Sequence, residues 1–476
     1  FAVASLILGT ASSQAAEVTE LTSAFQKNDP FDAHLSVGYG YRLSRGALKR
    51  EHAGDANQRS MGIVKEGRFS QVEHILNLRA EFGIWHDLQI HVALPITLSN
   101  ARTLSFAQNS GDDCKNPGPT GRVTDQCVTP ANSTLVKDGF LDRTALEGNN
   151  YRVTDWGSAS PPPGGLLLPN RAGVDQLHVG ISWAPVSQRR DSTKPTMVLG
   201  FEARFAVGSA MRYNPKDDPA TSSDDPLDER ARTNTSVGRG IHQLHWSVVV
   251  SRRFNRWVDP WFGMNYMLPI AASNSLFSQT MFDGTGQERA GPRHVGSFEA
   301  GMEIIPWEVK KERKKLSIEF RFKLTAFFEG RGYSPMWEVF ANSPRMIGAC
   351  IKDPNNTSST LLWDNGQYCQ NANQTLPFPG ITQIENYMNM GARMAVNFYF
   401  TKYFLGQLGV GLSHDTDHYI TYADAGRSLN PNGRIDLNDP RQVNPLYRPI
   451  VDAPGRRFRV EESTIFDFFI NLTGQF

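Results

Sequence analysis

The chain has 476 residues, and its 49 basic and 48 acidic side chains leave a formal charge of only +1 at pH 7. This balance excludes the basic surface that a nucleic-acid-binding protein needs, so we predict no nucleic-acid partner. Beyond the first segment no run of about 18 apolar residues occurs, which excludes a helical membrane span. The mean hydropathy is negative. That value fits a soluble secreted protein and also a β-barrel whose strands carry one polar face, so the periodicity of the sequence has to separate the two.

The first 16 residues join an apolar stretch to the small residues Ser12-Ser-Gln-Ala-Ala16. An apolar region followed by small residues is typical of a secretory signal peptide and its cleavage site. We therefore predict that residues 1–16 are the remnant of a signal peptide and that the mature protein starts near Ala16 or Glu17. A short periplasmic segment is expected at 17–31. An N-terminal helix packed on the domain is the alternative, but no apolar helical pattern continues after Ala16.

From residue 32 onward, apolar and polar side chains alternate in one segment after another, as they do in Leu35-Ser-Val-Gly-Tyr-Gly-Tyr-Arg-Leu43. A period of two is the strand period, whereas a helix repeats every 3.6 residues. The pattern predicts twelve strands, at 35–43, 76–84, 88–96, 177–183, 197–207, 244–250, 262–270, 298–304, 316–328, 392–400, 404–412 and 464–476. The strands near 177 and 262 have the weakest pattern, because a proline or a short run interrupts it.

The connections between these strands alternate strictly between short and long. Short connections lie near 85, 185–195, 255, 306–315 and 401, and long loops occupy 44–68, 97–173, 208–238, 271–293, 331–383 and 413–457. Short turns on one rim and long loops on the other are typical of transmembrane β-barrels, and a soluble sandwich has no reason to sort its loops in this way. With an even number of strands, both chain termini are expected on the short-turn side.

Aromatic residues gather at or beside the short connections. They are Trp85, Trp183, Trp257, Trp261, Trp307 and Tyr403. Indole and phenol rings favour a membrane interface, since one end of each ring is apolar and the other is polar. We predict that these residues form a ring at one rim of a barrel. The alternative is that aromatic residues favour strands in general and cluster here by chance.

The polar faces of the strands would point into a shared lumen. The predicted lumen residues are Arg42, Arg79, Glu81, His91, Glu202, Arg204, Glu299, Glu303, Glu319, Arg321, Lys323 and Arg393. Tight hairpins would place Glu81 opposite His91, Glu299 opposite Arg321 or Lys323, and Asn397 opposite Gln407. Two interpretations remain open for these charges. They could brace a narrow barrel, or they could line a water-filled path and set its charge preference.

The four cysteines form two local pairs, Cys114 with Cys127 and Cys350 with Cys369, within segments rich in Gly, Pro, Asn and Asp. Exported thiols normally oxidise, and short separations favour pairing within one loop. We predict two disulfides that staple external loops. A zinc site is the alternative, but no CxxC motif or nearby pair of histidines accompanies these cysteines.

The last eleven residues carry apolar side chains at 466, 468, 470, 472 and 476. This strand resembles the C-terminal signal of Gram-negative outer-membrane β-barrels, which end on Phe after apolar residues at alternate positions. The resemblance implies that Phe468, Ile470, Leu472 and Phe476 are recognised by the barrel assembly machinery. It also implies a place in the bacterial outer membrane, in contact with its lipid and lipopolysaccharide. Gly474 departs from the pattern, because such barrels usually carry Tyr or another large residue there.

Catalytic and metal chemistry finds little support in the sequence. An outer-membrane phospholipase uses a His-x-Ser pair that faces lipid, and this spacing occurs in His34-Leu-Ser36 and His245-Trp-Ser247. Alternation directs both pairs into the lumen, so we predict no catalytic residues. Asp415-Thr-Asp417 and Asp436-Leu-Asn-Asp439 could bind calcium through carboxylate oxygens, but turn chemistry explains them better. We predict neither a metal nor a cofactor.

The sequence thus predicts an all-β fold, a closed antiparallel transmembrane β-barrel of about twelve strands over 32–476, monomeric or weakly oligomeric. We expect a passive, porin-like channel for small hydrophilic solutes, with the loop at 97–173 long enough to constrict the mouth. The alternative is a barrel plugged by side chains or loops that acts as a surface structural or interaction protein. A lipid hydrolase is less favoured, and we predict that the protein is not an enzyme. The arginine-rich segment at 444–459 would attract lipopolysaccharide phosphates or an anionic solute.

Overall fold

The fold is seen in a computed structural model. It describes residues 16–24, 32–52, 62–107, 128, 133–138, 166–167, 170–211, 236–273, 275, 277, 286, 291–309, 312, 314–334, 348–349, 351–352, 360–361, 368–369, 375–376, 381–401, 403–429, 431–436, 439, 441–444 and 447–476. Three of the predicted disulfide residues, Cys114, Cys127 and Cys350, lie outside these ranges. Of Cys369 only the backbone is described, within β16 (Tyr368–Cys369). Both disulfides therefore stay predictions.

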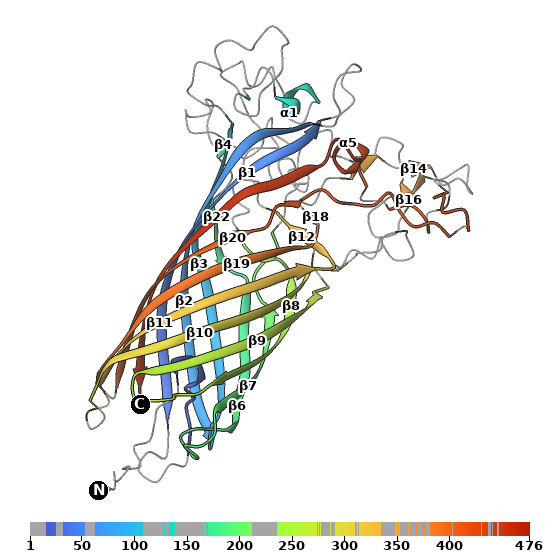
Figure 1. Cartoon of the computed structure of the whole chain (residues 1–476). Coiled ribbons are helices and arrows are strands. Elements are labelled where there is room, and N and C mark those ends of the chain that lie inside the picture. Colours follow the sequence, from blue (N-terminus) through green and yellow to red (C-terminus); the bar gives the residue numbers. More distant parts are fainter. Residues whose placement is uncertain are drawn as a thin grey trace, which may run out of the picture.

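Twelve long antiparallel strands form the barrel (Figure 1). They are β1 (Ala33–His52), β2 (Gly62–Trp85), β3 (Leu88–Phe106), β6 (Gln176–Val186), β7 (Thr196–Ala206), β8 (Ile241–Ser251), β9 (Val258–Ala271), β10 (His294–Val309), β11 (Lys314–Phe328), β19 (Tyr387–Thr401), β20 (Phe404–Asp415) and β22 (Phe458–Gln475). Each strand pairs with the next one along the chain. The predicted number of strands is confirmed, because the part of each strand that forms the wall alternates between two faces, as a barrel requires.

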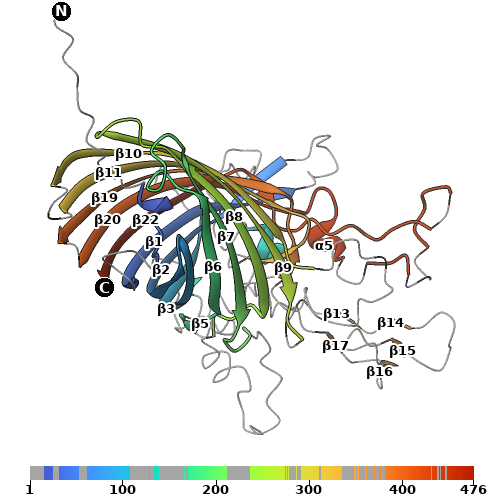
Figure 2. The ribbon, with the colours of Figure 1, turned by 90° about the horizontal axis from the view of Figure 1, so that it is seen from below.

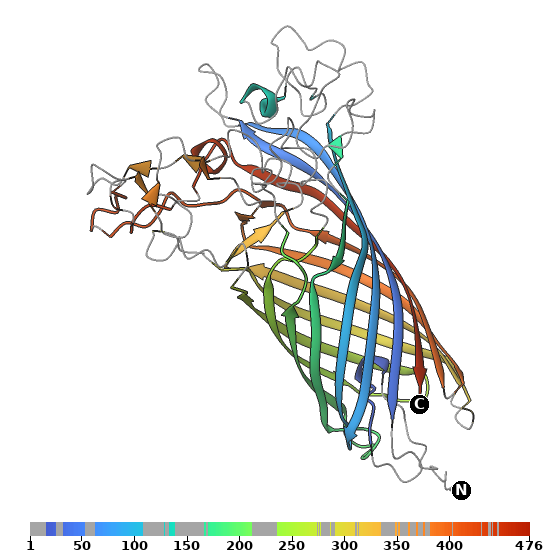
Figure 3. The same cartoon turned by 180° about the vertical axis from the view of Figure 1, so that it is seen from behind.

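The sheet closes where β1 pairs with β22, from His34 opposite Gln475 to Arg50 opposite Phe458. Ala33 and Phe476 add two backbone hydrogen bonds, of 3.1 and 2.9 Å, at the lower end of this seam. In lipid every backbone N–H and C=O must find a partner inside the protein, so a sheet in a membrane has to close. The red β22 and the blue β1 lie side by side in Figure 3, and from below the strands curve into a wall (Figure 2).

Loop lengths divide between the two rims as the sequence predicts. The C-terminus lies at the lower, short-turn end of the barrel, and the described residues of the long connections lie at the upper end (Figures 1 and 3). The smaller elements are η1 (Glu17–Thr19), α1 (Thr134–Lys137), β4 (Leu166–Leu167), β5 (Arg171–Val174), β12 (Arg331–Tyr333), β13 (Gly348–Ala349), β14 (Ile351–Lys352), β15 (Thr360–Leu361), β17 (Thr375–Leu376), β18 (Ile381–Gln383), β21 (His418–Tyr419) and α5 (Pro449–Asp452). We call the short-turn end periplasmic and the opposite end external.

Two of the predicted loop boundaries are wrong. The expected loop at 44–68 is mostly strand, because β1 continues to His52 and β2 begins at Gly62. The expected loop at 97–173 begins with further strand, since β3 continues to Phe106. These extensions stand above the barrel wall (Figure 1). Their sequence gives no strand signal because neither face meets lipid there, so polar residues such as those of Lys49-Arg-Glu-His52 occupy both faces.

The segment expected in the periplasm, at 17–31, is placed differently over the part that is described. Residues 16–24, which we call the N-terminal segment, enter the barrel from the periplasmic end and contact β3, β8, β10 and β19 inside it. Its polar side chains find partners on the inner faces of these strands. This placement corrects the expectation. Residues 1–15, the bulk of the predicted signal peptide, lie outside the described residues.

Candidate functional site

The outer surface of the barrel carries a belt of exposed apolar side chains on strand after strand. Val37 on β1, Val248 on β8 and Phe322 on β11 are about half exposed, and Leu412 on β20 is 59% exposed. A contiguous apolar surface of this extent is not stable in water, but it matches the hydrocarbon of a bilayer. Among the described residues, no helix is long and apolar enough to cross a membrane.

The lower rim of this belt carries exposed aromatic residues, as the sequence predicts for the interface ring. Trp85, Trp183, Trp257, Trp307 and Tyr403 all project outward at the short-turn end. On the terminal strand, Phe466, Ile470, Leu472 and Phe476 likewise face outward. The chain is an outer-membrane β-barrel. This conclusion rests on its own closed sheet and apolar exterior, and recognition of the terminal strand by the assembly machinery stays a prediction.

Trp261 does not belong to the predicted ring. Its side chain is only 4% exposed, and the guanidinium carbon of Arg321 lies 4.7 Å from the centre of one of its rings. In β9 the inward positions are Asp259, Trp261 and Gly263, whereas Phe262 and Met264 face lipid. The closeness of Trp261 to a turn therefore does not put its side chain on the outer surface. The parity of its position in the strand directs it into the lumen.

The predicted lumen residues all lie on barrel strands, at positions that alternate with lipid-facing side chains. Glu202, for example, is buried between the exposed Phe201 and the half-buried Ala203 on β7. Three of them belong to one network in the wall. His91 Nε2 lies 2.9 Å from Glu202 Oε2, and Arg204 Nε donates to Glu202 Oε1 at 2.6 Å. These bonds compensate the Glu202 carboxylate and brace neighbouring strands.

The three cross-strand pairs expected from the sequence are present in the register. Glu81 lies opposite His91, Glu299 opposite Lys323, and Asn397 opposite Gln407. Two of these pairs are also in direct contact, since Lys323 Nζ lies 2.9 Å from Glu299 Oε1 and Gln407 Nε2 donates to Asn397 Oδ1 at 2.8 Å. Glu81 instead accepts a 2.7 Å bond from Arg79. Register is predictable here because the hairpin turns are tight, whereas the choice among neighbouring partners is not.

A second charged group crosses β10, β11 and β19. Arg321 donates to Glu299 at 3.2 Å and to Glu319 at 2.7 Å, and it lies opposite Arg393 in the register. The Arg393 guanidinium stacks on the ring of Phe469, with 3.5 Å between its carbon and the ring centre. No carboxylate of the described residues lies within ion-pair distance of Arg393. This cation is therefore held by an aromatic face and keeps its charge available to the lumen.

Two cavities occupy the lumen above the N-terminal segment. The upper cavity, of about 660 Å³, is lined by Arg102, Arg171 and other residues near the external end. The middle cavity, of about 640 Å³, is lined by Arg321, Lys323, Arg393, Asn389, Asp467 and their neighbours. Both cavities are lined by Arg42, Glu73 and Asp415. A space lined by both charged and apolar side chains therefore extends from the external end to the middle of the barrel.

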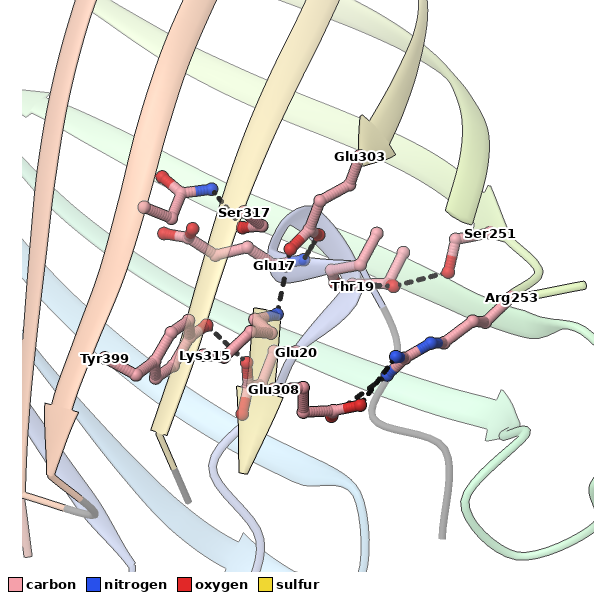
Figure 4. A network of polar contacts seen from close by, with 12 residues as sticks. Glu17, Thr19, Glu20, Ser251, Arg253, Glu303, Glu308, Lys315, Ser317 and Tyr399 are labelled. Atoms are coloured by element: carbon pink, nitrogen blue, oxygen red, sulfur yellow. Dashed lines mark hydrogen bonds and ion pairs between the residues drawn. The ribbon is translucent and has the colours of Figure 1, made fainter. Parts of the chain in front are cut away.

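Polar residues of the N-terminal segment meet side chains of the barrel wall inside the lumen (Figure 4). The amide of Glu17 donates to Glu303 Oε2 at 2.9 Å, and Tyr399 donates to Glu20 at 2.9 Å. Further hydrogen bonds join Thr19 to Ser251, at 2.7 Å, and the amide of Thr22 to Gln89 Oε1, at 2.8 Å. Almost all of these contacts are polar. The segment thus closes the periplasmic end with hydrogen bonds that water can replace at modest net cost.

Close passage of this segment along β2 depends on Gly83. A Cβ atom added at Gly83 would lie 2.8 Å from backbone atoms of Ser23, which is closer than real Cβ atoms approach other atoms. The amide of Ala24 also donates to the carbonyl of Trp85 at 3.2 Å. Glycine at this position lets the segment lie directly on the wall.

The His-x-Ser pairs face the lumen, as predicted. Ser36 Oγ lies 2.8 Å from Thr473 Oγ1 inside the barrel, and His245 lies opposite Glu202 in the register. Leu35 and Trp246, their neighbours, are the residues that face lipid. Neither pair can therefore reach a lipid ester. Among the described residues, no group of three His, Cys, Asp or Glu side chains is arranged to hold a metal ion.

The aspartates considered for calcium take part in local contacts. Asp439 accepts hydrogen bonds from the amide and guanidinium of Arg441, and Asp417 lies 3.3 Å from Arg459. These are the turn and ion-pair contacts that short polar segments make on a surface. Their oxygens are therefore engaged without a metal.

The final external loop contains a buried carboxylate, Asp452, at the end of α5. It accepts hydrogen bonds from the amides of Arg448, at 2.8 Å, and Ala423, at 3.2 Å. Burial raises the pKa of Asp452 from its ordinary value of 3.8 to about 7, against the opposing effect of the nearby Arg448, while Asp424 adds to the rise. Since the folded pKa is the higher one, packing of this loop loses stability as the pH rises through about 7.

We expect α5 and its neighbours to exchange amide hydrogens more slowly at pH 5.5 than at pH 8, after correction for intrinsic chemical exchange. Asp452→Asn should abolish this difference, because the amide cannot ionise. It should also loosen the loop at both values, since the amide nitrogen cannot accept the bond from Arg448. Hydrogen exchange read by mass spectrometry over 447–457 checks this. An unchanged pH dependence in the variant would assign the effect to another group.

Comparison with known proteins adds little. No protein-family model and no curated protein matches the chain. Similar solved structures include an outer-membrane channel from Pseudomonas putida F1, at 9% identity and TM-score 0.34, covering 93% of this chain and 95% of that one. A FadL homologue of Pseudomonas aeruginosa has 7% identity, TM-score 0.30 and coverages of 93% and 90%. The outer-membrane protease OmpT of Escherichia coli has 8% identity, TM-score 0.26 and coverages of 94% and 96%. Likenesses this distant carry no argument about function.

Proposed function

We propose that the protein is a passive channel for small hydrophilic solutes, and that its N-terminal segment gates the periplasmic end. The observation that carries this proposal is the space formed by the upper and middle cavities. It ends near Asn471, which donates to Gln407, and Gln407 in turn donates to Glu17 of that segment. A barrel built solely as a scaffold gains nothing from such a space, because packed side chains would stabilise the wall better. The N-terminal segment is the part that must move for a solute to pass.

The contacts of this segment support a displaceable gate. Thr19 and Glu20 each make one hydrogen bond to a side chain of the wall, and Thr22 makes two to Gln89. Each such bond contributes only about 1 kcal/mol net, because water offers a replacement when the segment leaves. A plug meant to stay would instead bury large apolar side chains. The barrel wall, with its continuous backbone pairing, stays intact while the segment moves.

The alternative proposal is a permanently plugged barrel that serves as a surface structural or interaction protein. The external extensions of β1 and β2 and the loop containing α5 favour it, because they present folded surface outside the membrane. Reconstitution into planar bilayers separates the two. Discrete conductance steps from folded protein are expected for a channel. Persistent silence, both from the wild type and from a variant whose N-terminal segment is replaced, would establish the plugged barrel.

Arg393 should set part of the charge preference of this path. It lines the middle cavity, and no described carboxylate forms an ion pair with it. Arg393→Glu reverses one charge in a confined lumen, so we expect the reversal potential in a salt gradient to move toward cation preference. Arg434→Glu makes the same charge change at an exposed site in the external loop. An equal shift in both variants would mean that Arg393 does not lie along the ion path.

A further inference from the structure

A group of acidic side chains is buried at the periplasmic end of the lumen, around the start of the N-terminal segment. Asp259 on β9 is fully buried and Glu303 on β10 is 1% exposed. Two cations lie near them, but both are already engaged. Lys315 Nζ lies 2.8 Å from Glu303 Oε1, and Arg253 donates two hydrogen bonds to Glu308, the shorter at 2.8 Å. Asp259 is therefore left without an ion-pair partner among the described residues.

Asp259 is also left without a hydrogen bond of acceptable geometry. Neither of its carboxylate oxygens has a donor in the described part of the chain, although the backbone nitrogen of Ala16 faces the carboxylate. A buried carboxylate with no donor costs several kcal/mol, so a native barrel does not retain one without a reason. A cationic hydrogen-bond donor at the place of the Ala16 nitrogen would satisfy the Asp259 carboxylate.

Processing of the signal peptide supplies such a group. Ser13-Gln-Ala15 places small residues three positions and one position before the Ala15–Ala16 bond, as a signal-peptide cleavage site requires. Hydrolysis of that bond by a signal peptidase consumes one water molecule. The new carboxylate stays on Ala15, and the new amine on Ala16 takes up a proton. The amide nitrogen with a single N–H thereby becomes an ammonium group with three.

We propose that Asp259 is the binding site for the α-ammonium group that signal-peptide cleavage creates on Ala16, and that this ion pair locks the N-terminal segment in the lumen. An ammonium group can turn about its bond to Cα and direct a proton at either carboxylate oxygen, whereas a planar amide cannot. The next residue fixes the direction of entry, because the amide of Glu17 already donates to Glu303 at 2.9 Å. This inference rests on the proposed gating function, and it adds that closure of the periplasmic end depends on the new amine of Ala16.

Reactivity of the terminal amine tests the site directly and needs no channel activity. Protein exported through its own signal is purified in detergent, the start at Ala16 is verified by mass spectrometry, and the α-amine is acylated at pH 7 with an N-hydroxysuccinimide ester. We expect acylation of the folded wild type to be roughly tenfold or more slower than that of the denatured chain. Asp259→Asn should restore most of the lost rate. Asp191→Asn, on an exposed periplasmic turn, should leave the protection intact.

A second variant tests the site even if the Asp259→Asn protein does not fold. Two glycines inserted between Ala15 and Ala16 move the amine away from Asp259 and should also make it reactive. A start other than Ala16, or equally fast acylation in wild type and Asp259→Asn, would overturn the inference. Conductance is measured separately on the same samples. If the amine is protected but the barrel does not conduct, the Asp259 site is supported and the channel is rejected. If the amine is reactive and the barrel conducts, the channel is supported and the Asp259 site is rejected.

Discussion

Replacing residues 17–24 by a glycine–serine sequence of equal length should convert the barrel into an open pore whose single-channel conductance is several times that of the wild type. The replacement removes the side-chain hydrogen bonds that hold the segment to Ser251, Gln89 and Tyr399 while keeping the chain length. The middle cavity would then continue to the periplasmic end. Because the wall is paired through its backbone, its closure should survive the change. Planar bilayers measure the conductance.

The matched control is a glycine–serine replacement of 431–434, an exposed turn in the final external loop. It changes a similar kind of surface outside the lumen and should leave the conductance at the wild-type value. Far-UV circular dichroism confirms that each variant is folded. If the folded segment variant conducts no better than the wild type, the N-terminal segment does not limit passage and another constriction does.

Lys315→Met should destabilise the barrel by about 3–5 kcal/mol, the usual effect of removing one partner from a buried ion pair. The side chains of Lys315 and Glu303 are each 2% exposed, and the ammonium lies 2.8 Å from the carboxylate. Without the lysine, the Glu303 carboxylate would stay buried near Asp259 and would lack its ammonium partner. Urea unfolding, followed by the mobility of unheated samples in gel electrophoresis, measures the loss.

Lys314→Met provides the control one residue away. Lys314 pairs with Glu312, and both side chains are more than one third exposed, so its loss should cost less than about 1 kcal/mol. The double variant Lys315→Met with Glu303→Met should recover most of the stability, because it removes both buried charges. Equal destabilisation by Lys314→Met and Lys315→Met would show that burial of the pair contributes nothing.

The sequence predicts the barrel well because lipid imposes a strict rule on each strand. Leu316, Ile318 and Phe320 alternate with polar residues on β11, and so the strand, its register and its inward face all follow from one period. Outside the membrane this alternation is not required, and the sequence no longer predicts the strands. The extensions of β1 and β2 beyond the membrane have no lipid-facing side, so the sequence predicts loops there. Trp261 shows where the prediction fails. Its position beside a turn predicted a place in the aromatic ring, but its inward position on β9 buries it in the lumen.

The periplasmic end of the lumen could not be predicted in the same way. Glu17-Val-Thr-Glu20 has no periodicity and no motif, and it reads as an ordinary solvated linker. Its partners Glu303 and Tyr399 lie hundreds of residues along the chain, so only the closed barrel brings them within reach. Glu303 carries a detectable sign in the sequence, because its position on an inward face places it among the predicted lumen residues. That sign does not reveal which segment it receives.

The seam between β1 and β22 constrains the order of events during biogenesis. His34 finds its partner in Gln475, so the first strand to be translocated must wait for the last one. Until then two unsatisfied strand edges exist at once, and each is a template for mispairing with a neighbour or with another copy. Contacts this distant along the chain also form slowly. Both edges stay open to such mispairing for the entire interval between export of β1 and arrival of β22.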